Sequence, residues 1–324
     1  MRIVYLKTIF KNVGPAFSFR LFRELIRGKY DVIQSHQIPL NFTLIGAVAA
    51  KLVRKPHLIT FHGRLPAMFL DSWIGTAASA LSAAVTVQNQ YAYDLVEGFV
   101  PNRKLKTIPH GIDTDLFHKI TPGKKYVQKY NPKGNKVILF VGRMIPAKGV
   151  DVLLEAYAEI LKKEKKVTLL LCGDGPQRAE YEQLAKKLGV DSKAVFAGAV
   201  QQEDLPDLYA LSDVFVLPTT YHFADGTPIP SVSENFGLVI AEAMSCEKPV
   251  VAARIGGIPL WIDDNVTARL FEERNVADLA EKLDDALFDR KGDNKRLVTA
   301  AKQMIEDDYS WEAVIRQFDP LFRK

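Results

Sequence analysis

Short apolar runs rich in β-branched residues alternate with longer amphipathic stretches along almost the whole chain. Such alternation is typical of stacked βα units. Strands that are apolar throughout and separated by helices favour a parallel sheet covered on both faces. The pattern therefore predicts an α/β protein. In the first third, we expect strands at residues 2–6, 31–35, 57–61, 84–88 and 105–108, and helices at 16–27, 41–53, 67–82 and 91–99.

The alternation stops between residues 110 and 135, where Gly, Pro, Lys, Tyr and Asn predominate. That composition is typical of a linker, and a length of 324 residues also favours two domains. Two tandem α/β domains predict a ligand cleft at the carboxyl ends of their sheets. The second series has expected strands at 136–141, 167–172, 194–197, 214–217, 249–252 and 268–271, and expected helices at 149–162, 178–188, 205–211, 236–245, 276–288, 294–306 and 311–322.

Composition excludes several classes of protein. A hydrophobic content of 48% with 25% charged residues is that of a soluble globular chain. Lys7 and Lys11 follow the first apolar residues too closely for a secretory signal, and no apolar stretch is suited to span a bilayer. The two cysteines, Cys172 and Cys246, lie in apolar contexts and offer no metal framework. We therefore expect a cytoplasmic protein.

The net charge of +5 fits an anionic ligand or an acidic surface. Residues 16–29 form an amphipathic stretch with basic residues around its polar side. As a helix, it can rest on anionic lipid, which would give peripheral membrane contact, or pack inward with its basic face solvated.

The most informative polar pattern is the carboxylate pair Glu234 and Glu242, which flanks a Phe-Gly pair and an apolar run. If a helix starts near Gly237, its free N–H groups would attract an anion. Glu234 precedes this helix and Glu242 lies about two turns in, so both can face one cleft. Carboxylates there suit the hydroxyls of a sugar or ribose. The alternative is a buried helix with one capping and one incidental Glu.

A basic loop follows the first strand of the second series. Gly142 allows a tight turn, and Arg143 and Lys148 project from the strand's carboxyl end, which suits a diphosphate. The alternative is a solvated basic turn. The Gly-Lys-Ser/Thr ending of a Walker loop is missing. Residues 173–176 resemble half of a dinucleotide fingerprint, but Arg178 occupies the place of the third glycine, so we expect only a tight turn.

Histidines also follow predicted strands of the first series. His62 lies at a strand's carboxyl end, where an imidazole can polarise or orient a hydroxyl; the alternative is a histidine at the surface or core edge. His36 is placed similarly and is expected to be structural. Asp113 and Asp115 could suggest a metal, but Gly and Asp at this place suit a turn, so we expect no metal site.

Taken in order, these segments resemble one family: the retaining nucleotide-sugar glycosyltransferases of family 4. That family has the GT-B fold of two Rossmann-like domains with parallel sheets facing a central cleft. The resemblance covers nearly the whole chain and is centred on Glu234, seven intervening residues and Glu242. The segments that carry it are 31–36, 60–63, 108–117, 140–149, 170–176, 205–218, 234–249, 256–259 and 309–312.

The resemblance implies roles for the candidate residues. Arg143 and Lys148 would bind the donor diphosphate and stabilise it as a leaving group, with no metal or cofactor. Glu242 would hold the ribose hydroxyls, Glu234 would lie beside the donor sugar, and His62 would approach that sugar from the first domain. The implied catalytic set is His62, Glu234, Arg143 and Lys148; the donor site is completed by Gly142, by Val200 beside the base and by the amides of Phe236, Gly237 and Leu238.

The implied reaction is transfer of a hexose from a UDP-, GDP- or ADP-linked donor to a glycan or lipid-linked acceptor. Configuration would be retained, and the leaving phosphate would take the acceptor proton, in a role in polysaccharide biosynthesis. No nucleic-acid partner is expected, and an oligomer stays open. One alternative is a catalytically weak sugar-nucleotide binder or partner subunit. Another is a GT-B sugar-nucleotide epimerase, which the motif order disfavours.

The chain departs from the family pattern in several places. It starts at what resembles the family's third strand, without a Gly-Gly loop near Met1, which indicates either truncation or a minimal enzyme with a shortened first domain. Glu247 replaces a usual glycine and Leu260 a usual Glu, while residues 222–233 are longer than usual and form either a lid or a surface loop. The expected organisation is a first, acceptor-side domain at 1–118, a linker at 119–135, a donor domain at 136–310, and a helix at 311–324 that returns to the first domain.

Overall fold

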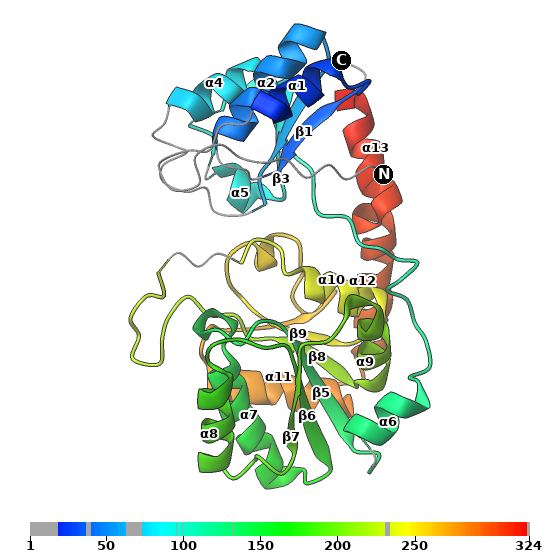
Figure 1. Cartoon of the computed structure of the whole chain (residues 1–324). Coiled ribbons are helices and arrows are strands. Elements are labelled where there is room, and N and C mark those ends of the chain that lie inside the picture. Colours follow the sequence, from blue (N-terminus) through cyan, green and yellow to red (C-terminus); the bar gives the residue numbers. More distant parts are fainter. Residues whose placement is uncertain are drawn as a thin grey trace. The chain divides into compact units, whose positions relative to one another are not determined.

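The computed structural model (Figure 1) describes residues 19–36, 40–62, 73–94, 96–98, 100–131, 133–230 and 234–322. The chain divides into two compact units, the first of Met1–His110 with Val314–Lys324 and the second of Gly111–Ala313. Each unit has its own parallel sheet, which confirms the predicted α/β class. The strand expected at residues 2–6 lies outside the described residues. Among the described helices, none is long and apolar enough to cross a bilayer.

The sheet of the first unit has the order β1-β2-β3-β4, with all neighbours parallel. Every residue of β2 and β3 is buried, including the polar His57, Thr60 and Thr86. The strands are β1 (Ile33–His36), β2 (His57–Thr60), β3 (Ala84–Val87) and β4 (Leu105–Thr107), and the helices are α1 (Phe19–Arg27), α2 (Leu40–Val53), α4 (Trp73–Leu81), α5 (Gln90–Asp94) and the short 3₁₀ turn η1 (Asn102–Lys104).

The C-terminal helix α13 (Trp311–Phe322) contributes apolar side chains to the first unit. Val314 and Leu321 share a buried cluster with Leu58, Ala84 and Ile108. The first unit is therefore built from two segments that the whole second unit separates in sequence.

The sheet of the second unit has the order β10-β9-β8-β5-β6-β7 and is parallel throughout. Counted from β5, this is the 3-2-1-4-5-6 order of the Rossmann fold, and the order reverses between β5 and β8. Its strands are β5 (Lys136–Val141), β6 (Val167–Cys172), β7 (Ala194–Gly198), β8 (Val214–Leu217), β9 (Val250–Ala253) and β10 (Arg269–Phe271).

Helices cover this sheet, with α7 packed against both α8 and α11, and α10 packed against α12. The long helices are α7 (Val150–Lys163), α8 (Arg178–Lys187), α10 (Leu238–Ser245), α11 (Val276–Phe288) and α12 (Asn294–Met304), and the shorter ones are α6 (Lys124–Tyr130), α9 (Leu205–Leu211), η2 (Pro146–Lys148), η3 (Gln202–Asp204), η4 (Ile258–Leu260) and η5 (Ile305–Tyr309).

Residues 119–135, predicted as a linker, contain α6 and belong to the second unit. Tyr126 and Tyr130 are buried in the core of that unit. Tyr126 Oη also donates a hydrogen bond to Asp204, and Gly123 N donates to Asp207 Oδ1 at 2.6 Å. The many Gly, Pro and Lys residues of this segment predicted a linker. Tyr126 and Tyr130, one helical turn apart, instead anchor it to the core of the second unit.

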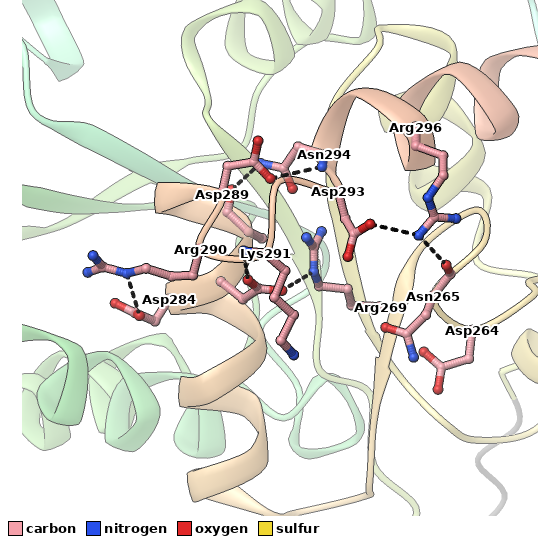
Figure 2. Close-up of polar contacts among 12 residues, drawn as sticks. Asp264, Asn265, Arg269, Asp284, Asp289, Arg290, Lys291, Asp293, Asn294 and Arg296 are labelled. Carbon is pink, nitrogen blue, oxygen red and sulfur yellow. Dashed lines mark hydrogen bonds and ion pairs between the residues drawn. The ribbon is translucent and has the colours of Figure 1, made fainter.

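A buried ion pair joins β10, α11 and the turn that leads into α12 (Figure 2). Arg269 Nε lies 2.8 Å from Asp285 Oδ2, and the two side chains are only 2% and 6% exposed. The second carboxylate oxygen of Asp285 accepts the backbone N–H of Lys291 at 3.1 Å. The turn is also held by Asn294 N, which donates to Asp289 Oδ1 at 2.9 Å.

Glu247, at the place of a family glycine, lies just beyond the end of α10 with φ 56°. Lys248 N donates to Ala243 O at 3.0 Å, which is the usual way for a helix to end with a left-handed residue. The Glu247 carboxylate lies 2.7 Å from both Lys119 Nζ and Lys302 Nζ. Glu247 thus makes two ion pairs at a position whose backbone conformation favours glycine.

Candidate functional site

The loops that follow β5 and β8 meet where the strand order reverses. Thr220 N donates to Ala147 O at 2.9 Å. Gly149 has φ 62°, and a Cβ atom there would lie 1.9 Å from Pro218 O, so this close approach requires glycine. In a Rossmann-type sheet, ligands bind at the carboxyl edge of this reversal.

Glu234 and Lys148 form a direct pair at this edge. Lys148 Nζ lies 2.6 Å from Glu234 Oε2, with the two side chains 23% and 12% exposed. Thr219 Oγ1 donates to the same oxygen at 3.2 Å. Within the described residues, Glu234 Oε1 has no hydrogen-bond partner, so one oxygen of a largely buried carboxylate is open to a hydroxyl.

The backbone of Glu234 is held as firmly as its side chain. Its N–H donates to Tyr221 Oη at 3.0 Å, and its carbonyl accepts from Gly257 N at 2.8 Å. A Cβ atom at Gly256 would lie 2.3 Å from that carbonyl, so the glycine pair at 256–257 allows the contact. Glu234 is therefore a fixed group.

The start of α10 presents backbone donors beside this pair. Gly237, at φ 75°, precedes the helix without a capping side chain. In the described part of the chain, the amides of Leu238 and Val239 have no acceptor, which suits an anion. The Phe236 side chain is instead structural, because it is buried and stacks on Trp261 with ring centroids 4.4 Å apart.

Glu242 is more enclosed than the sequence indicated. Tyr209 Oη donates to Glu242 Oε2 at 2.8 Å. Burial raises the pKa of Glu242, and the hydrogen bond from Tyr209 lowers this pKa in part. Burial is also the main reason why the pKa of Tyr209 is raised well above its usual value. A further hydroxyl donor at Glu242 would favour its charged form.

Gly142, Arg143 and Val200 line one pocket of about 280 Å³, together with apolar side chains such as Val141 and Leu205. The loops after β5 and β6 touch at its floor, where a Cβ atom on Gly173 would lie 1.8 Å from Gly142 O. The Arg143 side chain is exposed, and no partner for it exists among the described residues. A pocket with apolar walls and a free guanidinium suits a flat group that carries an anion.

The segment 222–233, predicted as a lid or a surface loop, is described up to residue 230. Ile229 N donates to Tyr221 O at 2.7 Å, and Phe223 N donates to Thr227 O at 2.8 Å. With the Asp151–Arg274 ion pair, the segment lines a second cavity of about 570 Å³ in the second unit. The described part of the segment, residues 222–230, therefore contributes to one wall of this cavity.

His62 belongs to the first unit. Its Nε2 lies 2.7 Å from Nδ1 of His36, the residue expected to be only structural. Burial lowers the pKa of His62, and the neighbouring His36 lowers it further.

Asp113 Oδ1 accepts a hydrogen bond from Leu116 N at 2.9 Å, as in a turn. The described residues contain no group of three or more His, Cys, Asp or Glu side chains able to hold a metal ion.

Sequence reasoning missed three polar partners in the second unit. Thr219 and Tyr221 come shortly after β8, and the same reasoning that selected Arg143 after β5 could have found them. Tyr209 lies inside α9 and only tertiary packing brings it to Glu242, so no local pattern indicates it.

The chain has two α/β units, each with its own parallel sheet, and the second sheet has the Rossmann strand order. This is the GT-B class of fold. Solved glycosyltransferase structures share it. The Anabaena protein HepE in complex with UDP has a TM-score of 0.76 at 23% identity, covering 94% of this chain and 80% of its own. A glycosyltransferase from Rickettsia africae has a TM-score of 0.78 at 23% identity, covering 97% and 84%.

The chain belongs to the family "Glycosyl transferases group 1", whose model matches residues 124–304, and the "Glycosyltransferase Family 4" model matches residues 2–116. An uncharacterized glycosyltransferase of Methanocaldococcus jannaschii is 29% identical over 306 residues, 89% of this chain and 74% of its own. The sulfoquinovosyl transferase of Arabidopsis thaliana is 30% identical over 316 residues, 92% of this chain but only 57% of its own. A GDP-mannose-dependent phosphatidylinositol monomannoside mannosyltransferase of Mycolicibacterium smegmatis is 28% identical over 229 residues, 70% of this chain and 58% of its own.

Proposed function

We propose that this chain transfers a hexose from a nucleotide diphosphate sugar to a glycan or lipid-linked acceptor, with retention of configuration and without a divalent metal. One observation carries the proposal. The Lys148–Glu234 pair lies with Thr219 at the reversal of a Rossmann-type sheet, close in sequence to the free amides that start α10. Relatives named as sulfoquinovosyl and mannosyl transferases support the reaction type.

In this proposal, the donor diphosphate lies against the start of α10. Lys148 and the exposed Arg143 neutralise it, and the Leu238 and Val239 amides donate to its oxygens, as in other anion sites at helix starts. Lys148 then interacts with both the phosphate and Glu234, which leaves Glu234 Oε1 to accept a hydroxyl of the sugar. The pair is preformed, so little reorganisation accompanies binding.

The remaining donor contacts follow from the same placement. Glu242, oriented by Tyr209, accepts a ribose hydroxyl, and the base occupies the pocket that Gly142 and Val200 line. UDP-, GDP- and ADP-linked donors all fit this description. The HepE structures in complex with UDP and with UDP-glucose support a nucleotide-sugar donor.

The bond changes of the proposed step balance without a co-reactant. The bond between the sugar's anomeric carbon and the diphosphate oxygen breaks, and the acceptor oxygen bonds to that carbon on the same face. The leaving phosphate takes the acceptor proton. Lys148 and Arg143 stabilise the charge that develops on the diphosphate, which is the main electrostatic demand of the step. The expectation that His62 contacts the donor sugar stays a prediction.

Calorimetric titration with UDP, GDP and ADP in the presence of EDTA tests the proposal. At least one nucleotide should bind, and Lys148→Ala should weaken that binding about tenfold or more, because a hydrogen bond to a charged group contributes about 1.5–3 kcal/mol. Lys295→Ala, an exposed lysine on α12, serves as the matched control and should change nothing. Absence of binding to every nucleotide would refute the proposal. Binding without transfer over an acceptor panel would favour a sugar-nucleotide binder instead.

We further propose peripheral contact of α1 with anionic lipid on the cytoplasmic face of a membrane. Phe19 is 68% exposed, and Arg20, Arg23 and Arg27 are exposed on the same helix. Such a helix can insert Phe19 while its arginines meet lipid phosphates. Cosedimentation with phosphatidylglycerol vesicles should exceed that with phosphatidylcholine vesicles and should fall in Arg20→Glu/Arg23→Glu. Equal binding to both vesicles would contradict the idea.

A further inference from the structure

Three histidines of the first unit lie in a row beyond the carboxyl ends of its sheet. His36 ends β1, His62 follows β2 and His110 follows β4. The ring centroids of His36 and His62 are 5.0 Å apart, with ring planes 8° from parallel. Those of His62 and His110 are 5.2 Å apart, with planes 14° from parallel. Three strands that are distant in sequence therefore bring three imidazoles together.

The contact between His36 and His62 is a hydrogen bond from edge to edge. Nδ1 of His36 lies 2.7 Å from Nε2 of His62. An imidazole N–H points outward in the plane of its ring, so nearly parallel rings joined in this way lie side by side and not face to face. The bond occupies Nε2 of His62, and it needs one N–H and one lone pair. It cannot form when both of these nitrogens carry protons.

We propose that His36 is a positioning residue for His62, which it holds in one orientation and one neutral tautomer. The inference rests on the proposed function and on the prediction that His62 contacts the donor sugar, and it adds His36, to which no role in that function is given. Each direction of the bond gives the neutral His62 one defined tautomer: the proton is on Nδ1 when His36 donates, and on Nε2 when His62 donates. Catalysis through an imidazole depends on which nitrogen carries the proton.

The surroundings of the row support a neutral His62. Burial lowers the pKa of His36, and burial lowers that of His62 with a further contribution from the adjacent His36. Burial, with a contribution from His62, lowers the pKa of His110 to about 4. Adjacent imidazoles oppose one another's protonation because like charges would lie close together. Near neutral pH, the two imidazoles described beside His62 are therefore uncharged.

Two-bond ¹H–¹⁵N spectra of the full chain labelled at histidine test the proposal directly. At pH 7.5, His62 should show one neutral tautomer in the wild type. In His36→Phe the two nitrogens of His62 should move toward averaged shifts, because the partner is gone. In His36→Asn the single tautomer should persist, because an Asn amide can donate or accept near the former Nδ1. Averaged shifts for His62 in the wild type would overturn the proposal without any variant.

Kinetics give the second measurement. His36→Phe should lower kcat about tenfold or more while KM for the donor changes less than twofold, since misplacement of a catalytic group affects the reacting geometry. His36→Asn should recover most of the lost kcat. His118→Phe removes an exposed imidazole of the second unit and should leave both kcat and the His62 spectrum unchanged. Unchanged kcat and spectrum in His36→Phe would overturn the inference. Failed nucleotide binding by the wild type would instead refute the proposed function and leave the tautomer result intact.

Discussion

At the scale of single residues, the first unit contains a buried imidazole that is separate from the histidine row. His57 is 2% exposed. Its Nε2 lies 2.9 Å from Ser35 Oγ, and its Nδ1 lies 2.7 Å from Ser82 Oγ. Burial lowers the pKa of His57 from 6.5 to about 4. The ring thus joins two hydroxyls inside the core in its neutral form.

We expect this histidine to make the first unit sensitive to acid. The unfolded chain binds a proton at His57 near pH 6.5 and the folded chain only near pH 4. Stability is therefore fully present above pH 6.5 and falls as the pH decreases to about 4, by roughly 3 kcal/mol in total. Urea unfolding at pH 7.5, 6 and 5 measures the loss. In His57→Gln the slope against pH should decrease by up to about 1.4 kcal/mol per pH unit; an unchanged slope would contradict this assignment.

A second residue-scale prediction concerns Gly149, whose absent side chain permits the contact with Pro218 O. Gly149→Ala should weaken nucleotide binding about tenfold or more, because the loop that carries Lys148 must shift. Gly134→Ala is the matched control, since Gly134 has a similar φ of 64° but open space around it. That variant should lose about 1 kcal/mol of stability and keep its nucleotide affinity. Equal affinities in the two variants would show that the close approach is unimportant.

At the scale of elements, the buried pair Arg269–Asp285 connects the last strand of the second unit to α11. Asp285→Asn should destabilise this unit by about 3–5 kcal/mol, because the buried guanidinium would keep its charge without a partner. Asp284→Asn, which changes a partly exposed neighbour paired with Arg290, should cost less than about 1 kcal/mol. Denaturant titration of both variants decides the matter, and similar losses would contradict the interpretation.

Much of the element pattern could be predicted from the sequence. Strands β5, β6 and β8 begin and end where predicted, because continuous apolar runs bounded by polar residues leave little freedom. Helix α6 was missed because its anchoring tyrosines contact residues more than seventy positions away, such as Asp204. At the site, Arg143 and Lys148 could be selected from their places at a strand end. The bonds from Tyr209 to Glu242 and from His36 to His62 arise only when separate elements pack.

At the scale of the whole molecule, α13 contributes to the core of the first unit. Leu321→Ala should lower the stability of that unit by about 2–4 kcal/mol, because the variant removes a buried side chain from the cluster with Leu58 and Ile108. Hydrogen exchange should accelerate in the first unit, while nucleotide affinity stays unchanged. Ile315→Ala, at an exposed position of the same helix, should change stability by less than about 0.5 kcal/mol. Faster exchange confined to the second unit would contradict this division.

The segment 314–322 also sets the order in which the chain can mature on the ribosome. Domains generally fold as they emerge, starting from the N-terminus. Here Leu58, Ala84 and Ile108 are synthesised early, but Val314 and Leu321, which complete their cluster, emerge only after the entire second unit. The second unit can therefore reach its final state first. The first unit keeps apolar surface exposed until residues 314–322 have emerged, and this surface is where a chaperone would bind the nascent chain.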